Sequence, residues 1–324
     1  MFKDKKNLGF LLAFMATICW SSFYIVSRYA FGEHNDLIDP VFFSFLRFLM
    51  ASIFFSVILA TQKNLGLALR TFKCNMGIFA VLALSGIILE GILIFWSLKY
   101  TTASRSSLFA NASPIFTVLL AFFVLGENLG LRKIAGMALG FAGAGIAIFS
   151  PGNGDIYFTG MALLGDLLAL LSGICWAAYT VWGASVAKKY GSFLSTAIPM
   201  ILGTVITGGI VVLSERPMLW NLSWDLWLAI IYLGIFGNAL SFLCWYAALR
   251  HLKAGELGAF GYISAGLTAV LSFVFLKESF TLWFFIAMAA VILGVYLMLE
   301  KENTKTTKFA IEDEDRSPQP QNTF

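Results

Sequence analysis

Charged side chains are scarce in this sequence. Asp, Glu, Lys and Arg together make up 12% of the 324 residues, whereas soluble domains carry about 25%. Hydrophobic residues reach 59%, and they form runs close to the roughly 20 residues that a helix needs to cross the hydrocarbon core of a bilayer. The composition therefore excludes an ordinary soluble domain and predicts an all-α integral membrane protein embedded in a lipid bilayer. The net charge of +4 is too small and too dispersed to predict a nucleic-acid partner.

Cysteine and histidine are also rare. The four Cys and two His show neither a disulfide framework nor the spacing of metal ligands. The sequence has no Walker A motif, so ATP is not expected to drive the protein directly. An enzyme would need reactive groups near one membrane face, but His34 and His251 fall in loops on opposite predicted sides. We therefore expect no enzymatic activity, no metal and no cofactor.

The chain contains two copies of one unit. Glu127 and Glu278 lie 151 residues apart, and Leu98–Tyr100 matches Leu249–His251 at the same offset. Two further ranges match at an offset of 156, Ile18–Phe23 and Ile174–Tyr179. Two homologous membrane halves usually frame a substrate path between them.

Ten apolar segments follow the two copies, five in each. We place transmembrane helices at about 9–29, 40–61, 76–97, 102–125, 132–149, 161–186, 193–213, 225–247, 256–276 and 281–299. This division predicts an N-terminal segment 1–8, a first repeat 9–150, a connecting loop 151–160, a second repeat 161–299 and a disordered tail 300–324. The tail is charged and contains Pro, as solvated segments do.

The basic residues predict the orientation of the chain. Sixteen of the 22 Lys and Arg residues fall on one predicted side, together with both termini, and five fall on the other. Because cytoplasmic loops are enriched in Lys and Arg, both termini are expected in the cytoplasm, on the inner side of the cell (plasma) membrane. Each half has an odd number of spans, so the second half enters from the opposite side. The predicted fold is a 5+5 inverted-topology repeat.

An ordered set of short motifs over about residues 9–299 resembles the drug/metabolite transporter superfamily, of the EamA type. The motifs are Cys19-Trp20-Ser21-Ser22, Arg47-Phe48, Ser97-Leu98-Lys99-Tyr100-Thr101, Pro114, Gly126-Glu127, Gly165-Asp166-Leu167-Leu168-Ala169 and Lys277-Glu278. The resemblance implies a ten-helix inverted-repeat carrier of small metabolites, often directed outward, without fixing one substrate. The sequence departs from the family pattern at Glu90, where the third span is usually apolar, and at Ala265, where the first half has Pro114.

Glu90 is the most informative single side chain. A carboxylate in the middle of an apolar span costs about 2.5–3.5 kcal/mol, so it should face a cavity or a partner. Its repeat mate is Ser241, so the charge is not a general feature of the fold. Three interpretations stay open: a proton-coupling or substrate-amine site, a structural ion pair with Arg47, and a cavity residue with neither role.

Two further groups of residues could line a substrate path. Span four carries a polar stripe, which has two interpretations: ordinary helix packing or the wall of a substrate path. In the second, Ser107 and Asn111 contact the substrate and Tyr262 faces them from span nine. Repeat-equivalent Trp20 and Trp176 lie near the middle of spans one and six. With Tyr24 they form either a stacking surface for a planar or cationic substrate or part of the core.

Other acidic and glycine residues have structural interpretations. Glu127 and Glu278 are expected to cap the helices that follow them, at Leu131 and Leu282, and Asp166 is expected to act similarly at the membrane interface.

A glycine stripe in span five predicts either tight packing inside the bundle or a possible homodimer face. It consists of Gly136, Gly140, Gly143 and Gly145.

Together these features predict a secondary active transporter of a small metabolite. The predicted path has aromatic rings, hydroxyls, one Asn and one carboxylate, which favours amino-acid-like or amine-bearing solutes over polyanions. Alternating access around a central site, with proton or exchange coupling, is expected. The alternative is a passive facilitator (uniporter) of the same solutes. A non-transporting receptor would share the fold but show no flux.

Overall fold

The apolar segments of the sequence form helices. The computed structural model describes residues 2–34, 39–125, 130–149, 160–214, 222–252, 254–278 and 280–298, and these contain helices and connecting turns but no strand. Six stretches are long and apolar enough to cross a membrane: Lys5–Ala30, Pro40–Thr61, Met76–Tyr100, Ala103–Val124, Gly160–Leu213 and Trp224–Ala248. The predicted tail 300–324 and all of the predicted connection 151–160 except Gly160, the first residue of a helix, lie outside the described residues.

The first half contains five predicted spans and one helix that was not predicted. Its elements are α1 (Phe2–His34), α2 (Pro40–Thr61), α3 (Leu65–Cys74), α4 (Met76–Ala83), η1 (Leu84–Leu89), α5 (Glu90–Tyr100), α6 (Ala103–Ala110), α7 (Ser113–Leu125) and α8 (Leu131–Phe149). The short α3 was expected to be a loop. Span four was expected to be one helix, but it breaks at Asn111 because Pro114 falls in the first turn of α7, where Pro is tolerated.

The second half begins with one long bent helix. Its elements are α9 (Gly160–Leu213), α10 (Trp224–Tyr232), η2 (Leu233–Leu240), α11 (Ser241–Ala248), α12 (Ala254–Phe275) and α13 (Leu282–Met298). α9 covers the two predicted spans 161–186 and 193–213. The boundary between them is the bend at Gly191, where φ is 80° and ψ is 159°. That conformation is accessible to glycine and strained for other residues.

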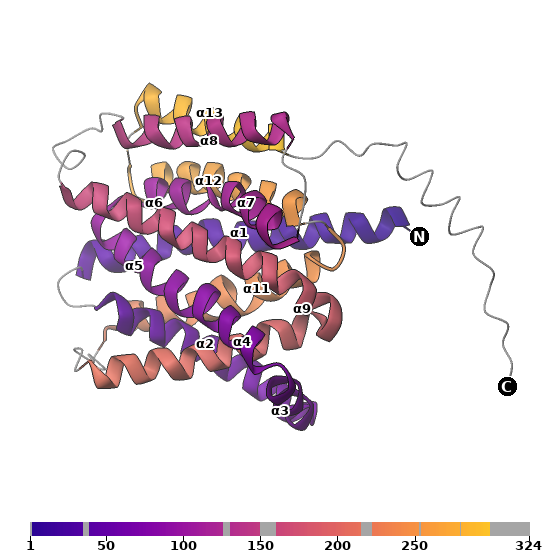
Figure 1. Cartoon of the computed structure of the whole chain (residues 1–324). Helices are drawn as coiled ribbons and strands as arrows, with labels where there is room; N and C mark the ends of the chain where they lie inside the picture. The colour runs from indigo at the N-terminus through magenta and orange to yellow at the C-terminus, as the bar shows by residue number, and fades with distance from the viewer. Residues whose placement is uncertain are drawn as a thin grey trace, which may run out of the picture.

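The two halves run in opposite directions. In Figure 1 the N-terminus, α3 and the bend of α9 lie at the same end of the bundle, whereas α9 begins at the other end. We call the end with the N-terminus, α3 and the bend of α9 the bend end. The close contacts of two glycines repeat the inversion: Gly9 packs against the His251 side chain at the bend end, and its repeat mate Gly165 packs against Thr101 at the opposite end. The fold is therefore the 5+5 inverted repeat that the sequence predicted.

α8 and α13 form a layer of their own beside the bundle (Figure 1). A Cβ added to Gly294 would lie 2.6 Å from the Gly136 carbonyl oxygen, so the two backbones touch. Gly143 makes a similar contact with Ala287. The glycine stripe of span five thus packs within the chain, and the possible homodimer stays a prediction that the stripe no longer supports.

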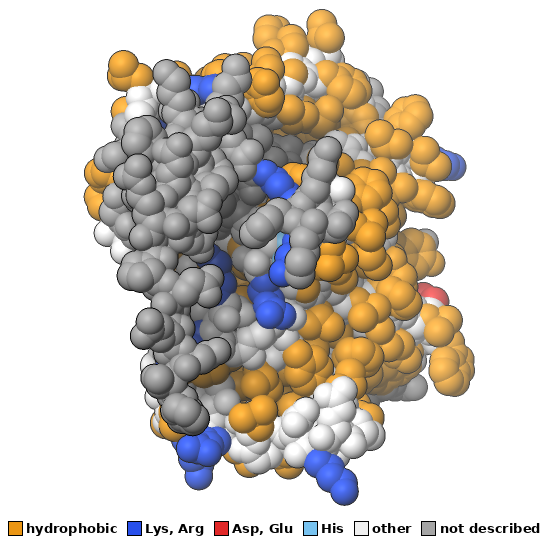
Figure 2. Space-filling view, turned by 90° about the vertical axis from the view of Figure 1, so that its right-hand side faces the viewer, with side chains coloured by type: hydrophobic (Ala, Val, Ile, Leu, Met, Phe, Trp, Pro, Cys, Tyr) orange, Lys and Arg blue, Asp and Glu red, His pale blue; other side chains and the backbone are white. Residues whose placement is uncertain are grey.

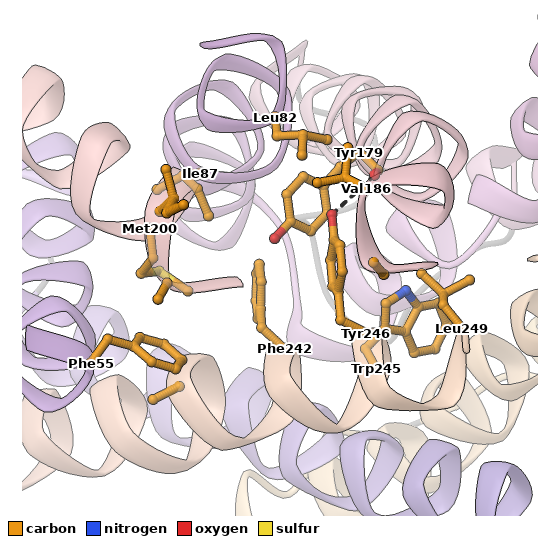
Figure 3. Close-up of a cluster of buried hydrophobic side chains, with 14 of the residues drawn as sticks. Phe55, Leu82, Ile87, Tyr179, Val186, Met200, Phe242, Trp245, Tyr246 and Leu249 are labelled. Carbon is orange, nitrogen blue, oxygen red and sulfur yellow. Dashed lines mark hydrogen bonds between the residues drawn. The ribbon is translucent and has the colours of Figure 1, made fainter. Parts of the chain in front are cut away.

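The bend end is filled by a cluster of buried apolar side chains (Figure 3). Tyr179 and Tyr246 are fully buried, and the Tyr246 hydroxyl donates a hydrogen bond to the Tyr179 carbonyl oxygen at 3.3 Å. Phe242 and Trp245 lie beside them and reach toward the centre of the bundle. This cluster forms the floor of the cavity described next.

Candidate substrate-binding cavity

A cavity lies between the two halves, inside the apolar helices. Its void, counted with its open side, is about 620 Å³. Six residues that the sequence singled out line it: Trp20, Tyr24, Arg47, Glu90, Asn111 and Trp176. They come from α1, α2, α5, α9 and the turn between α6 and α7. Trp20 and Trp176, which are 156 positions apart in the sequence, thus meet at one place.

Arg47 is buried in a largely aromatic environment. It is 2% exposed, and its guanidinium carbon lies 4.1 Å from the centre of the Phe48 ring, with Phe23 and Phe95 also within 5.0 Å. Such cation–π contacts stabilise a desolvated guanidinium by up to about 2 kcal/mol each. Its Nη1 donates a hydrogen bond of 2.8 Å to Oδ1 of Asn238. The cation is therefore held in place from the second half of the chain.

Glu90 faces this cation without a hydrogen bond to it. Arg47 Nη2 and Glu90 Oε2 are 3.7 Å apart, which is an ion pair but too long for a hydrogen bond. Both atoms are buried and have no hydrogen-bond partner among the described residues, and the same holds for Arg47 Nε. The Glu90 side chain is 18% exposed, and it borders the cavity. Glu90 thus both pairs with Arg47 and borders the cavity, two features that the sequence left as alternatives.

Two π-helical segments position the groups around Arg47. η1 ends directly before Glu90, and η2 contains Asn238, three residues before Ser241, the repeat mate of Glu90. π-segments are rare and occur frequently at functional sites. Gly91 and Gly234 allow the close approach, because an added Cβ would lie 2.9 Å from Arg47 Nη2 and 2.8 Å from the Arg47 carbonyl oxygen, respectively. Sequence reasoning missed Asn238, although an amide inside an apolar span was the available signal.

A group of aromatic rings forms one wall. Trp20 and Trp176 meet edge to face, with ring centroids 5.0 Å apart. Trp245 lies 4.9 Å from Trp20, and Phe242 lies 5.1 Å from Trp176. The rings are therefore packed on one another and also border the cavity, so both interpretations of Trp20 and Trp176 stay open. Trp245 and Phe242 were not predicted, because single apolar residues in an apolar span carry no signal of their own.

The polar stripe of span four contributes one wall residue. Asn111 lines the cavity and donates from Nδ2 to the Ser107 carbonyl oxygen at 2.8 Å and to Ser107 Oγ at 3.1 Å. Ser107 itself is fully buried and lies behind the wall. The side chain of Tyr262 lies outside the described residues, but its neighbour Gly261 borders the cavity.

Acidic residues at the end opposite the bend contact α6. Asp166 accepts hydrogen bonds from Arg105 Nε at 3.2 Å and from Thr101 Oγ1 at 3.0 Å, and it also pairs with Arg105 Nη2. Glu278 accepts a hydrogen bond from the Ala103 backbone N–H at 2.9 Å. The expectation that Glu278 caps the helix at Leu282 was therefore wrong: the free N–H groups that it satisfies belong to α6, across the repeat boundary. Glu127 lies outside the described residues.

Comparison with known proteins agrees with this architecture. Residues 7–149 and 163–300 each match the EamA-like transporter family. The chain is 30% identical to an "Uncharacterized transporter" of Archaeoglobus fulgidus, over 90% of this chain and 98% of that protein. It is 25% identical to the "Uncharacterized transporter YyaM" of Bacillus subtilis, over 79% of this chain and 85% of that protein. A crystal structure with 20% sequence identity shares the fold, with a TM-score of 0.66 over 90% of this chain and 96% of that one. The chain therefore belongs to the EamA-like transporter family, as a multi-pass membrane transporter with two EamA repeats.

Proposed function

We propose that this protein is a secondary active transporter that exports a small amino-acid-like or amine-bearing metabolite by alternating access. The observation that carries the proposal is the Arg47–Glu90 pair. These two opposite charges lie 3.7 Å apart at the wall of a central cavity and are not hydrogen-bonded to each other. A pair so placed can accept a ligand between its members, because each charge has hydrogen-bonding capacity that the protein leaves unused.

The charges on the wall favour a zwitterion over an ion of one sign. Arg47 and Glu90 cancel each other, so a bound cation or anion would add an uncompensated charge to a poorly hydrated site. A zwitterion supplies a carboxylate for Arg47 and an ammonium for Glu90. Arg47 Nη2 and Asn238 Nδ2, both buried and without a partner among the described residues, are suitable donors for that carboxylate. Asn111 and the aromatic wall of Trp20 and Trp176 would contact the rest of the substrate.

Glu90 can also couple transport to protons. When a substrate carboxylate takes Arg47, the Glu90 carboxylate needs another partner, because an unpaired charge within the membrane is costly. The substrate ammonium and a proton are the two candidates, and one carboxylate does not hold both. Substrate and proton therefore exclude each other, and a proton that enters drives a substrate molecule out. In the alternative exchange mechanism, one substrate molecule replaces another on the same carboxylate and no proton is transported.

The basic residues support cytoplasmic termini in the cell membrane. Figure 2 looks onto the bend end, where Lys and Arg side chains stand out among apolar ones. Cytoplasmic loops carry such an excess. This orientation makes the bend end the inner face, from which an exporter takes up its substrate. The basic residues on elements at this end include Arg70, Lys73, Lys188, Lys189 and Arg250.

Transport into liposomes tests the proposal. Purified protein is offered labelled amino acids and amines, with and without a pH gradient, as wild type and as Glu90→Gln. We expect the wild type to accumulate a zwitterion against its gradient, and Glu90→Gln to lose this accumulation. Ser85→Ala is the matched control on the same span, because its hydroxyl is bonded to its own helix at Val81. Undiminished accumulation by Glu90→Gln would contradict the coupling role.

The passive facilitator is the alternative outcome of the same experiment. It is favoured if the wild type only equilibrates the solute under every gradient and Glu90→Gln does the same. Glu90 would then be a structural partner of Arg47, as the 3.7 Å separation also allows. A wild type that moves no solute at all, in a folded state, would overturn both forms of the proposal.

A further inference from the structure

A second group of buried charges lies at the end of the bundle opposite the bend. Asp166 is 1% exposed and Arg105 is 5% exposed. Two guanidinium nitrogens of Arg105 and the hydroxyl of Thr101 surround the Asp166 carboxylate. A buried carboxylate bonded in this way is fully compensated, and removal of either charged partner leaves an unpaired charge at a cost of about 3–5 kcal/mol.

Glu278 makes a second contact of the same kind. Its carboxylate accepts hydrogen bonds from the backbone N–H groups of Ala103 and Ser104, at 2.9 and 3.3 Å, and from the Ser104 hydroxyl. These N–H groups belong to the first turn of α6 and have no partner inside the helix. A negative charge there is also favoured by the helix dipole. We call Asp166 and Glu278, with their partners, the α6 clamp.

Both carboxylates of the clamp cross the boundary between the halves. Asp166 is on α9 and Glu278 follows α12, both in the second half, whereas α6 belongs to the first. The opposite end of α6 leads directly to Asn111 at the cavity wall. One short helix thus connects the clamp to the cavity, and movement of α6 away from the second half would open a way between them.

At the positions equivalent to Asp166 and Thr101, the bend end has different residues. The close contact of Gly165 with Thr101 has its counterpart in the contact of Gly9 with the Leu252 side chain. The repeat mates of Asp166 and Thr101 are Phe10 and Leu252, so apolar side chains stand where the clamp has a carboxylate and its hydroxyl donor. At this pair of equivalent positions the two ends of the frame therefore differ in polarity.

We infer that the α6 clamp is the gate of the cavity at the end opposite the bend, and that it must release α6 before the cavity opens there. An ion pair suits a gate that opens into water, because separated charges regain their hydration and the pair can form again. The inference goes beyond the proposed function, since it concerns access to the cavity and does not depend on the solute or on coupling.

Labelling of a cavity cysteine tests the gate without any substrate. The reporter is Ser113→Cys, a nearly isosteric change at the cavity wall, with all four native cysteines replaced by Ser. A membrane-impermeant maleimide is applied to either side of sealed vesicles. A separate protein that retains only the exposed Cys74, the last residue of α3 at the bend end, identifies the side of the vesicle membrane to which the bend end faces.

The clamp is weakened by Asp166→Asn and, separately, by Glu278→Gln. We expect each variant to label the reporter several-fold faster from the clamp side, with no faster labelling from the bend side. Glu278→Gln leaves the Arg105–Asp166 pair intact, so it keeps the test valid if Asp166→Asn does not fold. The matched control is Ser97→Ala, which removes a 2.8 Å bond to Ser106 within the first half. Unchanged labelling in a folded Glu278→Gln, or an equal increase in Ser97→Ala, would overturn the inference.

Discussion

Arg47 is hydrogen-bonded to Asn238 and not to Glu90. The Nη1–Oδ1 distance to Asn238 is 2.8 Å, whereas Nη2 lies 3.7 Å from Glu90 Oε2. Arg47 comes from the first half and Asn238 from the second, so this bond joins the halves at the cavity. The guanidinium is thus anchored by a neutral side chain, and its charge stays available to the carboxylate of Glu90 or to that of a substrate.

Replacement of Asn238 is expected to weaken substrate binding. Hydrogen bonds to charged groups contribute about 1.5–3 kcal/mol, so Asn238→Ala should raise the substrate Kd about tenfold or more. Asn238→Asp should impair binding further, because a fixed carboxylate would neutralise Arg47 and compete with the substrate. Equilibrium binding to purified protein measures both. Wild-type affinity in Asn238→Asp would show that Arg47 does not bind the substrate.

Gly261→Ala should disturb the cavity through Asn111. An added Cβ at this position would lie 2.9 Å from Asn111 Oδ1, which forces the amide to move and alters the wall. We expect KM for transport to rise several-fold while the protein stays folded. Gly266→Ala on the same helix is the control, since nothing lies within 4 Å of its added Cβ. Equal KM values for the two variants would contradict a role for Asn111 in the wall.

The architecture could be predicted because it depends on patterns that extend along the chain. Hydropathy located α2 to the residue, and the repeat of Leu98–Tyr100 at Leu249–His251 indicated the inversion. The break at Asn111 was not predicted, because Pro114 is compatible both with a kinked helix and with the start of a new one. α3 was missed because its ten residues are too few to span a bilayer and too basic to be read as a buried helix.

The candidate cavity could be predicted only in part. Glu90 and Arg47 were found because charges inside apolar spans are costly and conspicuous. Asn238 was missed because its role arises from the π-segment that directs it toward Arg47, and no sequence periodicity indicates such a segment. The partners of Glu278 were missed for a similar reason: the residue lies next to one helix in the sequence but contacts another in space.

The pairing of α8 with α13 should depend on Gly294. Its added Cβ would lie 2.6 Å from the Gly136 carbonyl oxygen and 2.7 Å from the Gly140 backbone nitrogen, and backbone atoms do not move aside as a flexible side chain does. Gly294→Ala is therefore expected to destabilise the protein by about 1–3 kcal/mol, as overpacking does. Thermal unfolding in detergent measures this against Gly209→Ala, whose added Cβ meets nothing within 4 Å. A Gly294→Ala protein as stable as the control would show that the two helices are not in close contact.

Trp20→Phe should separate the two interpretations of the aromatic wall. Trp20 packs on Trp176 and Trp245 and also borders the cavity. Phe keeps an aromatic ring in the cluster but attracts a cation less strongly than Trp does. If the substrate ammonium lies against this wall, its affinity should fall about fivefold, within the roughly 0.5–2 kcal/mol range of cation–π contacts. The control is Trp182→Phe, a partly buried residue that packs against the same core cluster but lies outside the cavity. Titration with the substrate and thermal unfolding are measured for both: a loss of stability in Trp20→Phe with unchanged affinity would assign the ring to packing alone.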